Sequence, residues 1–523
     1  MSHIKISTPL FCQRQIRIVF RRLIAEAFVL FLAIFNLPVV ASDLRIASSA
    51  SMPNEAANGS PLAIEGVTIL PMTSAATVLR DMTVILRSGR IEIIGPTGKT
   101  NIPNGIQRIS GAGKWLLPSL TDMHTHPEND RLARLLLGSE NVPNGTVRTE
   151  DIFLPYVANG VLQIVNMSAM SESIGQRIEI ESGRVLGPHM ALAAMIDGER
   201  PMLPVGLSRS ASTPSDGRQV VRDIKADGYD FVKAYSNLDA PTFVAIVDEA
   251  RKQGMRVFGH LPRKKTDLSK PWLDASLSMV VHAEEFAFQA KDVADAEAKI
   301  PEFVALAKAS GVWLTTTLTT DERILQQMRE PAFIRKMPEL RFLHPLTRIM
   351  WVDRNGYVNS PPARLALVEA ITVFNRKLVK AFVDANIPVV PGTDAFLPGV
   401  APGYSLHDEF EALVRAGLTP QQILFADTRL ASEFLGFGAD RGTVEVGKRA
   451  NLVLLDADPF DNISNTRRIA AVISNGRYYS SAALNKLMES MAARYAAMPL
   501  LNPGGSAKPA VGGLDHPFEN DTH

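Results

Sequence analysis

Short apolar runs alternate with helical patterns through the middle of this sequence, and this alternation is the feature that most constrains the fold. Helical periodicity is clear at 240–253 and 301–310. Strands that alternate with helices predict an α/β fold in which a parallel sheet closes into a (β/α)8 TIM barrel, here over residues 116–436. The predicted strands are Leu116–His126, Val161–Met167, Met190–Ile196, Asp230–Ala234, Met255–His260, Met279–Ala283, Val312–Thr317 and Pro388–Asp394.

Metal-capable side chains stand at the ends of several predicted strands, on the face where such barrels place their active sites. Alternate residues of a strand point to the same face, so His124 and His126 could hold one cation together. Four further candidates end later strands: Lys233, His260, His282 and Asp394. Each residue alone is more simply interpreted as a buried histidine with a satisfied hydrogen bond, or as an aspartate that caps a helix. Their joint position at strand ends predicts a metal site.

Lys233 is the unusual member of this set, because lysine is rarely buried without a partner. A lysine amine that loses its proton in such a site can take up carbon dioxide, and the resulting carbamate is a carboxylate able to bridge two cations. Tyr235 lies two residues further on and is expected to face the substrate from the same side. The one cysteine, Cys12, lies in the N-terminal segment, so the metal ligands are restricted to histidine, carboxylate and unusual donors.

The N-terminal segment has the pattern of a secretory signal peptide. Basic residues between Lys5 and Arg22 precede an apolar stretch at 27–35, and small residues at 39–41 suit the signal peptidase. We predict a signal peptide at 1–41, a linker at 42–61 and export to the periplasm or the medium, with no stable membrane anchor after cleavage. A retained anchor is the competing interpretation, although polar residues interrupt the run before the ~20 apolar residues that a span needs.

Length and charge set the remaining bounds. The chain of 523 residues is too long for one ordinary core, so an accessory module beside the barrel is expected. Its 55 Lys+Arg and 54 Asp+Glu residues leave a net charge of +1, which provides no basic surface for nucleic acid. A small molecule remains as the expected partner, and homo-oligomer formation is left open.

Several stretches beyond the last predicted strand add to the pattern of ligands. Ser405–Phe410 reads Ser-Leu-His-Asp-Glu-Phe, and Gly442–Lys448 leads into the apolar stretch Ala450–Asp456. Together with the strand-end residues, they resemble the amidohydrolase superfamily of metal-dependent hydrolases over residues 62–480, closest to its imidazolonepropionase-like and Xaa-Pro dipeptidase-like branch. The resemblance implies a discontinuous β-sandwich formed by residues 62–115 and 437–480 beside the barrel. A C-terminal helix and flexible tail are expected at 481–523.

The resemblance also implies how the candidate ligands are used. The two histidines of the first strand and Asp394 hold one divalent metal, taken as zinc, and His260 with His282 hold a second. Carbamylated Lys233 and a hydroxide lie between the two ions. Asp394 accepts the proton of the hydroxide and passes it to the leaving group, as a general base and then a general acid.

Two long segments between barrel elements are predicted to contact the substrate, because such segments often form lids or binding loops. The segment Leu318–Ala363 contains His344 and Arg348, and the segment Gly198–Ser212 contains Arg200 and Arg209. With Tyr235, these are the candidate substrate-binding residues. A solvated surface position is the simpler interpretation for each arginine.

The sequence therefore predicts an exported binuclear amidohydrolase that cleaves the C–N amide bond of a dipeptide, an Xaa-Pro peptide or an N-acyl amino acid. Two alternatives stay open. If Lys233 remains a free amine and one metal binds, the site would suit a mononuclear deaminase or a cyclic-amide hydrolase. A metal-binding protein without turnover is the third interpretation, and the acid–base residue Asp394 argues against it.

Export can be tested on protein from the native host. Cleavage after the small residues at 39–41 should give a mature chain that begins at or near Ser42. N-terminal sequencing of the exported fraction checks this. Recovery of a chain that still begins at Met1, or of membrane-bound full-length protein, would contradict it.

Overall fold

The computed structural model describes residues 60–137, 146–203, 206–262 and 277–498. The predicted signal peptide, most of the predicted linker and the tail beyond 498 lie outside the described residues, so their roles stay predictions. Within the described part of the chain, no helix combines the length and the apolar character needed to span a membrane.

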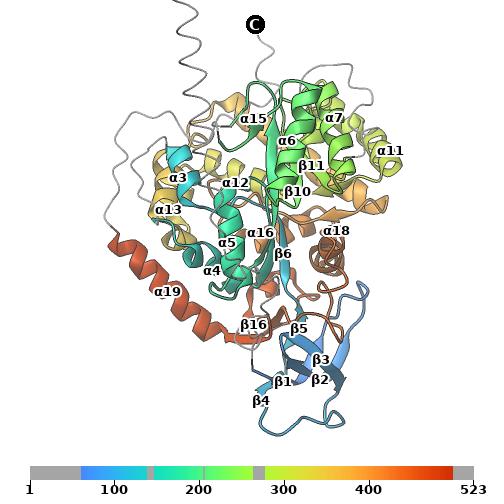
Figure 1. Cartoon of the computed structure of the whole chain (residues 1–523), viewed down its shortest axis with the longest axis vertical. Coiled ribbons are helices and arrows are strands. Elements are labelled where there is room, and N and C mark those ends of the chain that lie inside the picture. Colours follow the sequence, from blue (N-terminus) through green and yellow to red (C-terminus); the bar gives the residue numbers. More distant parts are fainter. Residues whose placement is uncertain (1–59, 138–145, 204–205, 263–276, 499–523) are drawn as a thin grey trace, which may run out of the picture. The chain divides into compact units, whose positions relative to one another are not determined.

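Eight parallel strands form a nearly closed barrel in the hydrogen-bonded order β14-β13-β12-β11-β10-β8-β7-β6. Each overlaps one of the eight predicted runs, so the predicted fold class is confirmed. Helices surround these strands (Figure 1). A two-residue strand, β9 (Arg209–Ser210), pairs with β8 outside this order. The barrel strands are β6 (Leu120–Thr125), β7 (Val161–Asn166), β8 (His189–Asp197), β10 (Phe231–Ala234), β11 (Arg256–Gly259), β12 (Met279–Val281), β13 (Trp313–Thr315) and β14 (Val389–Val390).

Alternation along the strands separates two apolar layers. In β8, Ala191 and Ala193 point into the barrel, where they join Phe231 and Phe258 in one buried cluster. Met190, Leu192, Ala194 and Ile196 belong to the larger cluster between the strands and the helices. Both faces of a barrel strand are thus buried, which explains why these strands appear in the sequence as continuous apolar runs.

Two helices around the barrel begin with side chains that cap their first turn. Thr213 and Asp239 accept hydrogen bonds from the first turns of α6 and α7, and a proline follows each cap. The helices are α3 (Asp130–Leu137), α4 (Thr149–Ala158), α5 (Ser171–Glu181), α6 (Pro214–Ala226), α7 (Ala240–Lys252), α9 (Glu284–Ala287), α10 (Val293–Ala298), α11 (Ile300–Ser310), α12 (Leu318–Arg329), α13 (Phe333–Lys336), α14 (Pro345–Arg348), α15 (Pro362–Asp384), α16 (Tyr404–Arg415), α17 (Pro420–Phe425), α18 (Ala431–Phe434) and α19 (Ser481–Ala497). Shorter helical turns are η1 (Pro338–Phe342), η2 (Ile349–Asp353), η3 (Ala426–Leu430) and η4 (Ile463–Arg467).

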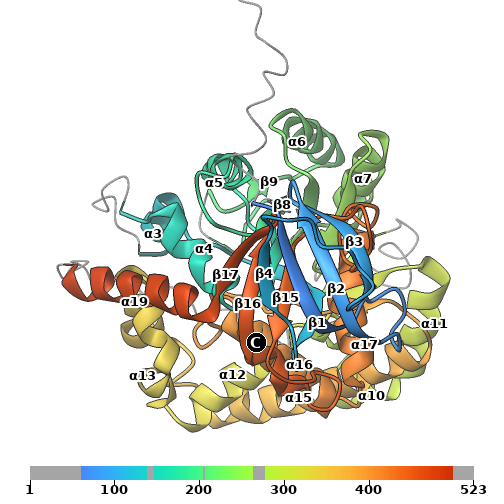
Figure 2. The ribbon, with the colours of Figure 1, turned by 90° about the horizontal axis from the view of Figure 1, so that it is seen from below.

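A second, mixed sheet is built from both ends of the described chain. Its strand order is β17-β16-β15-β5-β1-β2-β3, with β4 paired to β1. Figure 2 shows the N-terminal strands in blue beside the C-terminal strands in red and orange. A separate apolar cluster, which includes Leu62, Val84, Leu452 and Ile473, packs within it. The strands are β1 (Leu62–Ile69), β2 (Leu79–Arg87), β3 (Arg90–Pro96), β4 (Gln107–Ser110), β5 (Trp115–Pro118), β15 (Leu452–Leu455), β16 (Ile469–Ser474) and β17 (Arg477–Ser480).

The run from Leu116 to His126, predicted as one strand, forms two. β5 pairs antiparallel with β15 and belongs to the mixed sheet, whereas β6 opens the barrel. Pro118 is the last residue of β5, and a proline cannot donate to a further ladder bond. The backbone N–H of Ser119 donates to Asn451 and that of Leu120 to Gly160, so the chain changes sheets between these two residues.

The long segment between the seventh and eighth barrel strands also differs from the expected loop. Most of it is helical, from α12 through η1 and α14 to η2. His344 caps the start of α14, where its ring accepts a hydrogen bond from the N–H of Leu346.

Candidate metal centre

Three predicted ligands meet where the first and last barrel strands adjoin. Ligand atoms of His124, His126 and Asp394 all lie within 4.8 Å of one another. The Nε2 atoms of the two histidines are 3.1 Å apart, and Asp394 Oδ1 lies 2.9 Å from Nε2 of His126 and 3.2 Å from Nε2 of His124. Two imidazole nitrogens and a carboxylate oxygen in this arrangement are ligands typical of a zinc site.

The other predicted ligands lie against this group. Lys233 is buried, and its Nζ is 3.3 Å from Nε2 of His124. The ring of His282 is centred 4.6 Å from that of His124 and 5.0 Å from that of His260. The structure thus brings all six predicted ligands together. The distances define one three-residue group, while a second ion stays a prediction.

Neighbouring strands supply hydroxyls that orient three of these histidines. The Nδ1 atoms of His126, His260 and His282 each lie 2.8 Å from a side-chain oxygen. The oxygens belong to Ser168, Ser236 and Thr317. When Nδ1 of a histidine is engaged in this way, its Nε2 is directed toward the metal.

Sequence reasoning missed these hydroxyl residues, although a signal for them exists. Each stands two residues beyond the end of a barrel strand: Ser168 after β7, Ser236 after β10 and Thr317 after β13. It also missed Glu285, a fully buried carboxylate 3.2 Å from Nδ1 of His260. A carboxylate beside a ligand histidine is a common outer-shell partner in metal sites.

The backbone around the centre is strained. His282, Thr317 and Asp394 have φ values of 79°, 49° and 58°, in the left-handed region that is uncommon for any residue but glycine and rarest for a β-branched residue such as Thr317. Gly259, directly before His260, has φ 144°, and a Cβ there would lie 2.1 Å from the carbonyl oxygen of Ala234. Strain of this kind persists where packing over-determines it and clusters at functional sites.

Burial and charge prepare the side chains to bind a cation. Burial lowers the pKa of His124 well below its usual value, so its ring is neutral and offers a lone pair. Burial raises the pKa of Asp394, but the hydrogen bond and attraction to His126 act against it and the pKa falls to about 2. Burial lowers the pKa of Lys233 to about 8.

The carboxylate of Asp122 holds the backbone that carries the candidate ligands. It is fully buried and accepts hydrogen bonds from the N–H of His124 (3.1 Å) and from the N–H (3.0 Å) and hydroxyl (2.6 Å) of Thr393. Burial raises the pKa of Asp122 to about 7 against these bonds. The sequence pattern Asp-x-His-x-His contains it, since Asp122 faces the same side of the strand as the histidines.

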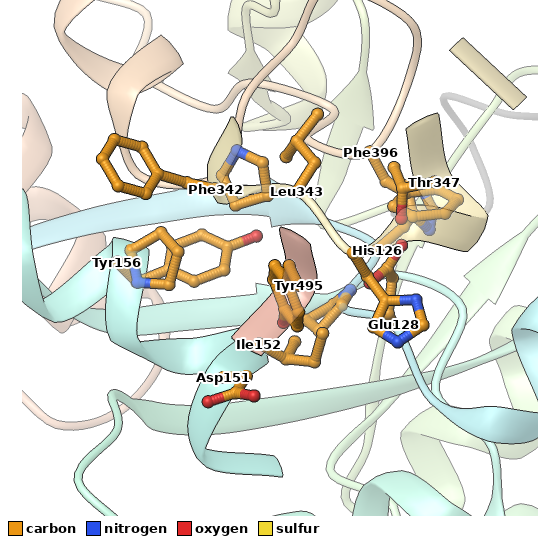
Figure 3. Close-up of a pocket in the computed structure, with 14 residues that line it drawn as sticks. His126, Glu128, Asp151, Ile152, Tyr156, Phe342, Leu343, Thr347, Phe396 and Tyr495 are labelled. Carbon is orange, nitrogen blue, oxygen red and sulfur yellow. The ribbon is translucent and has the colours of Figure 1, made fainter. Parts of the chain in front are cut away.

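A pocket adjoins the centre, and His126 lies in its wall. Tyr156, Phe342 and Phe396 give it apolar surfaces, and Glu128 is a buried carboxylate among them. In the view of Figure 3, His126, Glu128 and Phe396 lie toward one side and Tyr156 and Phe342 toward the other. The pocket is therefore placed to receive a molecule that reaches the metal ligands.

The wall of this pocket also includes Tyr495, from α19 near the end of the described chain. Arg494 beside it forms an ion pair with Asp151 of α4, and the two helices pack together. Sequence reasoning predicted a C-terminal helix and gave it no part in the site. No local pattern marks Tyr495 as a pocket residue.

The predicted substrate-binding residues fall into two groups. Tyr235 is buried with its ring centred 4.2 Å from that of His260, and His344 lies in the pocket wall. Arg209 pairs with Asp227 at 2.6 Å, and Arg348 donates to the carbonyl oxygens of Leu343 and Arg341. The side chain of Arg200 is exposed. Their contacts with substrate stay predictions.

A comparison with protein families decides where this chain belongs. The model of the amidohydrolase family matches residues 115–478, which is most of the chain. The chain belongs to the amidohydrolase family. As an amidohydrolase, it is an enzyme that acts on carbon–nitrogen bonds, and the predicted family resemblance is confirmed.

Individual relatives of this amidohydrolase are distant. Imidazolonepropionase of Shouchella clausii is 32% identical over 102 residues, which cover 19% of this chain and only 23% of that protein. A solved structure assigned as a prolidase from Bifidobacterium longum has a TM-score of 0.62 at 22% identity, covering 83% of this chain and 99% of the other. The structure of a Xaa-Pro dipeptidase with methionine bound in its active site has a TM-score of 0.60 at 18% identity, covering 80% of this chain and 100% of the other. At these identities the structural likeness shows the fold.

The hydroxyl that orients His126 can be tested by removing it. Ser168→Ala should weaken metal affinity by about 10–100-fold, because the ring loses the partner that directs Nε2. Competition with a chelator measures this. Ser171→Ala serves as the control, since that exposed hydroxyl contacts Glu172 outside the site. Equal metal affinity in both variants would contradict the assigned role.

Proposed function

We propose that this protein is an exported binuclear amidohydrolase that cleaves the C–N amide bond of a dipeptide, an Xaa-Pro peptide or an N-acyl amino acid. The observation that supports it most is the close approach of Asp394 and buried Lys233 to His124. Asp394 Oδ1 lies 3.2 Å and Lys233 Nζ lies 3.3 Å from Nε2 of His124. Family membership supports hydrolysis, and the likeness to solved prolidase and Xaa-Pro dipeptidase structures supports the peptide substrate. Export rests on the N-terminal sequence pattern alone.

The donor set suits two divalent cations, which we propose to be zinc. His124, His126 and Asp394 would hold one, and His260 with His282 would hold the other. Lys233 would join them as a carbamate. Its pKa of about 8 leaves roughly a tenth of its amine unprotonated at pH 7, and only the neutral amine reacts with carbon dioxide. Bound cations in such sites acidify water and polarise the scissile carbonyl.

The side chains of the chain would then orient the substrate and move the proton. Asp394 is ionised at neutral pH, so its carboxylate can accept the proton of the attacking water and return it to the departing nitrogen. Tyr235, two residues beyond Lys233, would donate a hydrogen bond to the substrate. The apolar pocket walls would exclude water from the reacting bond.

A mononuclear deaminase is the second candidate, and Lys233 separates it from the first. A free amine at Lys233 would add a positive charge beside His124 and would leave one metal with the group of His124, His126 and Asp394. The two readings differ in metal content and in product, and both can be measured on the purified enzyme.

Metal content tests the role of Lys233. The wild-type protein should hold close to two metals per chain, and Lys233→Ala should lose nearly all activity because the bridging carboxylate is gone. Short-chain carboxylic acids added to the variant should restore part of the turnover, since they supply the missing group. Elemental analysis and rate assays check this. Wild-type rate and metal content in Lys233→Ala would replace the binuclear proposal with the mononuclear one.

Proton transfer by Asp394 tests the chemistry. Asp394→Asn keeps an oxygen ligand of similar shape but cannot carry a proton, so kcat should fall at least about a hundredfold. Steady-state kinetics measures this, and the variant should still bind substrate. Product analysis of the wild type should show a free carboxylic acid and a free amine. Ammonia as the stoichiometric product would favour the deaminase, and full activity in Asp394→Asn would remove this residue from the mechanism.

A further inference from the structure

Glu128 is a buried carboxylate in the pocket that the proposed reaction does not use. Its residue is 8% exposed and lines the cavity that His126 also lines. Within the described ranges, no hydrogen bond or ion pair to its carboxylate is found. Asp151, the other acidic residue of the pocket wall, is already paired with Arg494. Burying a charge without a partner is costly, so Glu128 is suited to a partner that arrives with the ligand.

The backbone holds Glu128 at a short, defined distance from the metal ligands. Only Pro127 separates it from His126, and two residues of chain span at most about 7 Å. The proline ring fixes its own φ and restricts the preceding residue to extended conformations. Gln176 donates from Nε2 to the carbonyl oxygen of Glu128 at 3.0 Å, which anchors the residue from the neighbouring helix α5.

The surroundings of Glu128 favour a cation. The same pocket presents the aromatic side chains of Tyr156, Phe342, Phe396 and Tyr495 (Figure 3). Aromatic faces attract ammonium groups, and a carboxylate adds a charge-assisted hydrogen bond. Arg348 and Arg209 are held by their own partners, and neither belongs to the pocket wall. The pocket therefore provides a carboxyl group within apolar walls, beside the candidate metal ligand His126.

We propose that Glu128 binds the free α-ammonium group of the substrate, which makes dipeptides with an unblocked N-terminus the substrate class. This inference rests on the proposed amide hydrolysis. In a dipeptide the α-nitrogen is two bonds from the scissile carbonyl carbon, so a carboxylate one short step from His126 can reach it while the carbonyl meets the metal ligands. An N-acyl amino acid has no ammonium at this position and would leave Glu128 buried and unpaired.

The test compares three substrates on the metal-loaded enzyme: phenylalanyl-proline, its desamino analogue, and aminohexanoyl-proline, whose amine is at the far end of the acyl chain. Wild type should prefer phenylalanyl-proline over the desamino analogue by at least about tenfold in kcat/KM, the range of a hydrogen bond to a charged group. Glu128→Gln should reduce this preference to within about threefold, mainly through a higher KM for phenylalanyl-proline.

A matched variant and a binding measurement separate the failures. Glu150→Gln removes the same charge from a carboxylate that pairs with Arg148 outside the pocket wall, and it should keep the wild-type preference. Metal content and thermal unfolding establish that both variants are folded. Calorimetric titration with L-phenylalanine and with its desamino analogue measures the same preference without turnover. Wild type should bind L-phenylalanine more tightly than the desamino analogue, and Glu128→Gln should bind the two with similar affinity.

Each other outcome has a definite reading. Equal cleavage of the desamino analogue by wild type, or an unchanged preference in Glu128→Gln, would overturn the assignment. Preference for aminohexanoyl-proline would overturn it in favour of a side-chain cation. If none of the three amides is cleaved but L-phenylalanine still binds through Glu128, the proposed reaction fails while the ammonium site stands.

Discussion

The carboxylate of Asp122 is the contact on which the centre most depends. It accepts hydrogen bonds from the backbone of His124 on the first barrel strand and from Thr393 beside the last. The seam is completed by the N–H of Asp394, which donates to the carbonyl of His124 at 2.8 Å. Of the three grouped candidate ligands, His124 and His126 belong to the first-strand side of this contact, and Asp394 belongs to the last-strand side. Closing the barrel and assembling the ligand group are therefore one structural event.

The remaining predicted ligands depend on the same close fit between neighbouring strands. Hydroxyl groups that follow adjacent strands orient His260 and His282, and His282 also holds a left-handed backbone conformation that is costly outside this setting. Gly259 permits β11 to approach the carbonyl of Ala234 more closely than any side chain would allow. The geometry of the centre therefore depends on how the strands pack together as well as on which residues stand at their ends.

The barrel could be predicted, and the candidate ligands that it brings together could be named, because both leave local signals. A strand buried on both faces is a continuous apolar run, and a ligand at its end interrupts that run with a polar residue. The division of Leu116–His126 into two strands could not be predicted, because its cause is pairing of β5 with β15 near the other end of the chain. The pocket residue Tyr495 escaped for the same reason. Likewise, the partner of Arg209 is visible only once Asp227 is seen beside it.

The mixed sheet determines how late in synthesis the fold can be completed. β5 lies between β1, from the start of the described chain, and β15, made long after every barrel strand. The wall that Tyr495 provides comes later still. A ribosome would therefore finish all six predicted ligand residues while the strand beside β5 and one side of the pocket are still missing. The enzyme gains its finished cavity only with the last helix of the described chain, so partly synthesised chains lack the shape that selects a substrate.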